Sequence, residues 1–136
     1  MPGKSAGLLA FLLLIAGPAS TEHEVAYRYT VIGYVEDARG RPHPGVIVEL
    51  VRQKTGYTYL GASDASGLYV VTARLGDESL GERLRLQAGA HGVEITARFD
   101  PADHTRERGT RVDWVAGKAV ERPGAFATTL QRFLGE

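Results

Sequence analysis

The 136-residue sequence contains no cysteine. That absence excludes disulfides, thiolate metal sites and cysteine nucleophiles. A chain of this length has room for one hydrophobic core and can fold without a disulfide. An excess of charge is also missing, because 16 Lys and Arg balance 16 Asp and Glu. The balance gives no support to nucleic-acid binding or to electrostatic adhesion to a membrane.

Long apolar runs are scarce, and the longest one lies at the start of the chain. It extends from Ala6 to Ala16, after the positive charge of Lys4 and before Gly17-Pro18. A membrane-spanning helix needs about 20 apolar residues, so this run is too short for an anchor. The order of charge, apolar run and small residues is typical of a secretory signal peptide over residues 1–20. We therefore expect a periplasmic or secreted protein with no transmembrane segment after cleavage.

Helical periodicity is absent from the central part of the chain, where short segments alternate apolar and polar residues instead. Seven such segments follow one another, at residues 27–35, 46–51, 57–63, 68–74, 83–88, 92–99 and 110–116. Their spacing of roughly ten residues, with glycine-rich turns between them, is typical of an antiparallel sandwich. The sequence predicts an all-β fold: a seven-stranded antiparallel Greek-key β-sandwich over residues 21–116.

Two four-residue segments place Asp first and Gly last, at Asp37 to Gly40 and at Asp64 to Gly67. This is the preferred pattern of a type I turn, in which the Asp carboxylate accepts a backbone N–H. We expect a positive φ at both glycines. His43 lies between two prolines just after the first turn, where chain reversal explains the local sequence better than a reactive loop does.

The segments VIGYVEDARGRPHPGVIVELV and TGYTYLGASDASGLYVV resemble the carboxypeptidase regulatory-like domains of the prealbumin-like (transthyretin-like) sandwich group. The matching positions are Ile32-Gly33-Tyr34-Val35, Asp37, Gly40, Pro42, Gly45, Val48, Leu50, Ser63-Asp64, Gly67 and Tyr69. The resemblance covers about residues 28–99. It implies a Greek-key sandwich, usually non-catalytic, that is appended to or associated with exported enzymes, transporters and surface proteins. The family has no shared catalytic residues.

Two enzymatic relatives of this fold are less compatible with the sequence. Transthyretin-like hydrolases use a C-terminal Tyr-Arg-Gly-Ser, whereas this chain ends in QRFLGE. Intradiol ring-cleaving dioxygenases bind iron through two Tyr and two His, and no His-x-His occurs here. Ser63, in GASDA, lacks the second glycine of a nucleophile elbow. We therefore predict no catalytic residues, no metal ligands and no cofactor.

Other ligand sites and functions remain as alternatives. The loop residues Asp100, Asp103 and His104 have the ligand types of a cation site, although a solvated loop is the better interpretation. Cleavage after Ser20 would place His23 third in the mature chain, a geometry suited to Cu(II). A small metal-dependent or hydrolytic enzyme would use His43, His91 or His104, and a third alternative is a transthyretin-like carrier of a small ligand.

The C-terminal tail, residues 117–136, contains a short amphipathic pattern. Phe126, Leu130, Phe133 and Leu134 fall on one face of a helix of about ten residues. We expect this face to pack on the protein's own sandwich. The alternative is docking on a partner subunit with Phe126, Leu130 and Phe133 as anchors. The signal peptide, the sandwich pattern along the chain and the lack of an assembled catalytic set lead us to expect an exported, non-catalytic accessory or binding subunit. Its partner would be another protein of a periplasmic, membrane or extracellular complex.

Overall fold

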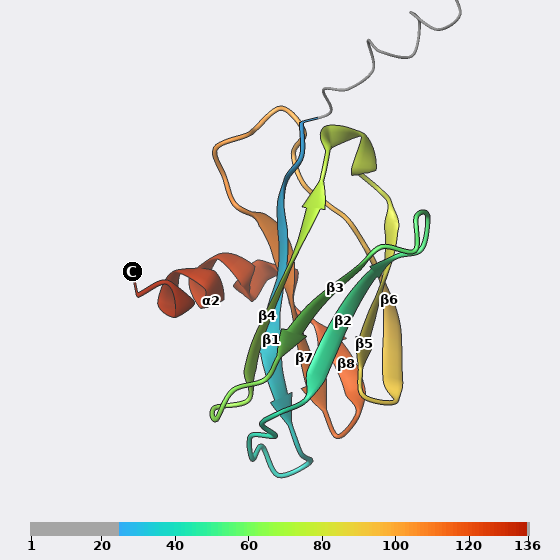
Figure 1. The fold of residues 1–136 in the computed structure, drawn as a ribbon. Coiled ribbons are helices and arrows are strands. Elements are labelled where there is room, and N and C mark those ends of the chain that lie inside the picture. Colours follow the sequence, from blue (N-terminus) through green and yellow to red (C-terminus); the bar gives the residue numbers. More distant parts are fainter. Residues whose placement is uncertain (1–24, 136) are drawn as a thin grey trace, which may run out of the picture.

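The computed structural model describes residues 25–135, which form a two-layered β-sandwich with a short C-terminal helix (Figure 1). The expected signal peptide and His23 lie outside these residues. The strands are β1 (Tyr27–Glu36), β2 (Ile47–Arg52), β3 (Thr58–Ala62), β4 (Leu68–Leu75), β5 (Arg83–Ala88), β6 (His91–Thr96), β7 (Arg108–Val115) and β8 (Lys118–Glu121). One four-stranded sheet has the order β4-β1-β7-β8 and the other has the order β3-β2-β5-β6. The predicted all-β sandwich is confirmed.

The strand count differs from the predicted seven, because β8 forms an additional strand beside β7. The two are joined by a two-residue turn, in which Ala116 has φ 50° and Gly117 has φ 81°. Positive φ at both positions is the requirement of the tight turn that joins adjacent antiparallel strands. The sandwich therefore extends to Glu121, past the boundary expected at residue 116.

One pair of strands is parallel, in contrast to the wholly antiparallel prediction. β1 lies at the centre of its sheet, antiparallel to β4 and parallel to β7. In the parallel pair, Val35 lies beside Trp114. Alternation of apolar and polar residues says which face of a strand is buried but not which strand is its neighbour or in which direction that neighbour runs.

The core lies between the sheets, where the apolar positions of the alternating pattern meet. Val31, Val48, Leu50, Leu86 and Val112 are fully buried there. β3 and β4 approach closely along one side of the sandwich, and a Cβ built on Gly61 would lie 2.3 Å from the Val70 carbonyl oxygen. Only glycine fits this approach, which closes that side of the sandwich.

Both predicted turns have the expected geometry. Asp64 accepts the amide of Gly67 at its carbonyl (2.9 Å) and the amide of Ser66 at its carboxylate (2.9 Å). The hydrogen bond from the Ser66 hydroxyl is the largest of several that hold the pKa of the Asp64 carboxyl below its usual value. Gly40 and Gly67 have φ of 77° and 82°, so the prediction of a positive φ at both glycines is confirmed.

The C-terminal segment forms a 3-10 turn, Pro123–Ala125, followed by the helix α2 (Phe126–Phe133). α2 lies on the outer face of the sheet that contains β1 (Figure 1), where Phe126 and Leu130 form a second apolar cluster with Ile32. These two side chains are buried against their own sheet, so a partner cannot reach them in this conformation. Phe133 remains 49% exposed. In residues 25–135, no helix is long and apolar enough to cross a membrane.

Candidate functional site

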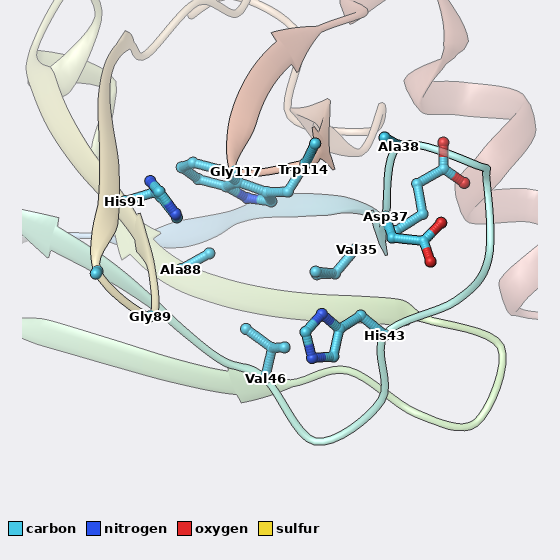
Figure 2. Close-up of a pocket in the computed structure, with 13 residues that line it drawn as sticks. Val35, Asp37, Ala38, His43, Val46, Ala88, Gly89, His91, Trp114 and Gly117 are labelled. Carbon is cyan, nitrogen blue, oxygen red and sulfur yellow. The ribbon is translucent and has the colours of Figure 1, made fainter.

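A pocket opens at one end of the sandwich, between the two sheets (Figure 2). Three connections surround it: the loop between β1 and β2, the turn between β5 and β6, and the turn between β7 and β8. Its volume is about 340 Å³. The lining residues are Val35, Glu36, Asp37, Ala38, His43, Val46, Ala88, Gly89, Ala90, His91, Trp114, Ala116 and Gly117. We call this cavity the end pocket.

The inner walls of the end pocket are apolar because strand alternation directs these side chains between the sheets. Val35 and Trp114 lie side by side on β1 and β7, and Ala88 comes from the facing sheet. Each of the three is no more than 7% exposed. Trp114 is the single tryptophan of the sequence. The end pocket is therefore an extension of the hydrophobic core toward solvent.

The imidazoles of His43 and His91 lie on opposite sides of the end pocket (Figure 2). The backbone holds His43 in place, because its amide donates to the Val35 carbonyl (2.8 Å) and its carbonyl accepts from the Ser63 hydroxyl (2.8 Å). His91 is the first residue of β6 and lies against Gly117, where an added Cβ would come within 2.6 Å of its Nε2. Gly117 thus leaves room for the ring.

Ser63 has a structural task in this loop. Its hydroxyl donates to the His43 carbonyl and accepts the amide of Val46 at 2.8 Å. It is 6% exposed and bonds to backbone groups rather than to an imidazole. This geometry agrees with the interpretation of Ser63 as a turn residue and explains why the loop keeps a buried hydroxyl.

The two acidic residues of the lining do not direct a free carboxylate into the end pocket. Asp37 accepts the amides of Arg39 and Arg41 (2.9 Å each) and Nε of Arg41 (2.7 Å). The backbone hydrogen bond from Arg41 is the largest cause of its lowered pKa. Glu36 alternates with Val35 on β1 and so faces the outer side of the sheet. On that side Asp113, with a smaller contribution from Glu36, raises the pKa of Arg111.

Tyr69 and Trp114 meet in the core, and of the two only Trp114 also lines the end pocket. The Tyr69 hydroxyl donates to the Val112 carbonyl, and burial raises the pKa of this hydroxyl, which keeps it protonated. Trp114 Nε1 is buried and lies toward the Tyr69 hydroxyl. This indole N–H offsets part of the rise in the pKa of Tyr69. It makes no well-oriented hydrogen bond within residues 25–135.

His104 lies at the opposite end of β1, far from the other two histidines. Its Nε2 is 2.8 Å from Asp77 Oδ2, and its ring stacks on Tyr27 with the centroids 4.6 Å apart. Arg108 is inserted beside them, its guanidinium between the rings of Tyr27 and Phe99. These contacts form a structural cluster that closes this end of the sandwich, and Asp77 was not identified from the sequence.

The predicted loop of Asp100, Asp103 and His104 does not assemble as a cation site. Asp100 accepts the amide of Ala102 (3.0 Å) and Asp103 accepts the amide and hydroxyl of Thr105 (2.9 and 2.8 Å). His104 turns to Asp77 instead. Across residues 25–135, no three His, Asp or Glu side chains are grouped in a way that could hold a metal ion.

Asp113 is another residue that was not singled out from the sequence, and its carboxylate is buried. It lies on the outer side of β7, 4% exposed, and accepts the amide of Tyr34 (3.0 Å) across the parallel pair. Arg111 and Arg122 donate to it at 3.0 Å. Arg111 in turn donates to the hydroxyl of Thr129 on α2 (3.0 Å), so this network links the sheet to the helix.

Comparison with known proteins gives few matches. No protein-family model and no curated protein matches the sequence. Among solved structures, the dioxygenase domain of a novel dioxygenase carbohydrate-binding protein fusion from the cellulolytic bacterium Streptomyces sp. SirexAA-E aligns over 71% of this chain and 82% of that chain. The sequence identity is 16% and the TM-score is 0.43, a level that carries no argument about function.

Proposed function

We propose that this protein is an exported, non-catalytic β-sandwich that acts as an accessory or binding subunit of a larger periplasmic, membrane or extracellular complex. The end pocket is the observation that supports this proposal. A concave, mostly apolar cavity with a few polar groups at its mouth is the usual form of a recognition site. It lies where three connections meet, as binding sites on sandwich scaffolds often do.

The same geometry gives less support to a hydrolytic or metal-dependent enzyme. A catalytic imidazole is normally oriented by a third group and lies within hydrogen-bond reach of a nucleophile. Asp37 is bonded to its own turn, and the Ser63 hydroxyl is bonded to backbone groups. A carrier of a small ligand is the second candidate function, favoured by the apolar lining and the volume of the end pocket.

The proposal is tested by site-specific photocrosslinking in intact cells of the native host. The photoreactive residue replaces Ala90, at the mouth of the end pocket, or Ala102, an exposed alanine at the opposite end. We expect one discrete crosslinked product from position 90, identified by mass spectrometry, and none from position 102. Equal labelling from the two positions, or none from either, contradicts the proposal. Filling the end pocket by Val46→Phe should remove the product from position 90.

A further inference from the structure

We infer that the end pocket binds a small, uncharged organic molecule with an apolar body of one or two rings and at least one hydrogen-bonding group. The inference rests on the proposed function as a binding module and specifies the ligand class of that module. Three properties of the end pocket carry it: its volume, the absence of a counter-charge, and the placement of the two imidazoles.

Volume limits the size of the ligand. Cavities that bind small molecules typically measure about 300–1,000 Å³. The end pocket, at about 340 Å³, lies at the lower limit of that range. It accepts a molecule of one or two rings, whereas an oligosaccharide or a long acyl chain does not fit. Val35, Ala88 and Trp114 provide the apolar surface against which such a body is removed from water.

Charge limits the chemistry of the ligand. An ionised group that enters an apolar cavity without a partner loses much of its hydration free energy. Asp37 is compensated by Arg41 at 2.7 Å, and Glu36 belongs to the outer side of its strand. Among the described residues that line the end pocket, no charged side chain is therefore placed to pair with a bound carboxylate or ammonium. Neutral ligands are favoured over both kinds of ion.

The imidazoles supply the polar recognition. Within residues 25–135, His104 is the histidine whose ring is hydrogen-bonded to the protein. His43 and His91 therefore keep their ring nitrogens for a ligand between them (Figure 2). A neutral imidazole has one donor and one acceptor nitrogen, so it pairs with a hydroxyl, carbonyl or amide group.

Trp114 makes the inference directly measurable, because the single tryptophan of the chain lines the end pocket. Its indole N–H gives one resolved cross-peak in a ¹⁵N–¹H correlation spectrum. Three probes of the same ring size are titrated into the purified protein: benzyl alcohol, benzoate and benzylammonium. We expect benzyl alcohol to shift the indole peak saturably and to bind about tenfold or more tightly than either ion, since each ion is desolvated without a partner. No saturable shift, or equal binding of a charged probe, overturns the inference.

Two matched variants locate the binding. Val46→Phe places a ring in the end pocket and should weaken benzyl alcohol binding about tenfold or more. Leu60→Phe adds the same ring at an exposed position on β3 and should leave benzyl alcohol binding unchanged. The spectra themselves show whether each variant is folded. A tight complex in folded Val46→Phe would place the probe elsewhere and refute the site.

The probe titration and the crosslinking experiment separate the two proposals. If benzyl alcohol does not bind but the crosslink from position 90 persists, the ligand class is wrong and the accessory role stands. If benzyl alcohol binds at Trp114 and no crosslink forms, the ligand site stands and the protein is a carrier rather than a subunit. If both fail, the end pocket has no recognition function.

Discussion

Gly40 and Gly67 occupy equivalent positions in two similar turns, yet they should respond differently to the same substitution. Both have positive φ, 77° and 82°, so alanine at either position is strained. Left-handed backbone costs an L-residue about 1–2 kcal/mol, and the stiffer unfolded chain returns about 0.4–1 kcal/mol. On backbone strain alone, each Gly→Ala substitution should destabilise the protein by about 1 kcal/mol.

Their surroundings distinguish the two glycines. A Cβ at Gly40 would have no atom within 4 Å, whereas a Cβ at Gly67 would lie 2.6 Å from the Val35 carbonyl oxygen. That oxygen belongs to the backbone and already accepts the amide of His43 at 2.8 Å, so it cannot move freely. Crowding of this kind adds about 1–3 kcal/mol. Gly67→Ala should therefore cost about 2–4 kcal/mol in total.

Urea unfolding followed by Trp114 fluorescence measures both costs in the same way. A loss of 1 kcal/mol lowers the midpoint by about 0.3–1 M urea, so the two substitutions are clearly distinguishable. Gly40→Asn is the control, because asparagine tolerates positive φ better than alanine and should lose less stability. If Gly67→Ala is no more destabilised than Gly40→Ala, the close approach of the Val35 carbonyl is refuted.

Three further predictions concern the helix, the buried carboxylate and pH. Phe126→Ala, at a buried position, should lower the free energy of unfolding in urea by about 3 kcal/mol. Phe133→Ala, at an exposed position on α2, should change it by no more than about 0.5 kcal/mol, and equal losses would contradict the packing of α2. Asp113→Asn should cost about 3 kcal/mol, because it leaves Arg111 and Arg122 without their anion, and an unchanged midpoint would refute this. The pKa of Asp64 is lowered on folding, so its stabilisation is present above about pH 4 and is lost as the pH falls further. Asp64→Asn should flatten the acid side of the stability curve, and an unchanged slope would contradict that.

The sequence predicted the individual strands and turns well, because those depend on neighbouring residues. β5 has the predicted boundaries, Arg83–Ala88, and both Asp-to-Gly turns form as expected. β8 was missed because its turn, Ala116–Gly117, lacks the Asn-Gly or Asp-Gly signal of a tight hairpin. A non-glycine residue at φ 50° is uncommon, and the sequence gives no sign of it.

The candidate site was harder to predict because its residues are brought together by topology. His43, His91 and Trp114 come from separate loops and strands, and no spacing in the chain relates them. Their meeting requires the parallel pairing of β1 with β7, which alternation does not encode. By contrast, His104 and Asp103 are neighbours in the sequence but turn to different partners in the structure.

The parallel pairing of β1 with β7 also sets the order in which this protein is able to fold. Tyr34 and Asp113, which join these strands, are 79 positions apart, so β1 cannot acquire its second neighbour until most of the chain is available. Contacts between such distant residues make folding slow, because the loop entropy is lost before the contact forms. A sheet whose centre is its first strand thus stays open during synthesis. If the protein is exported, as proposed above, this delay would keep the chain unfolded until its last strands are available.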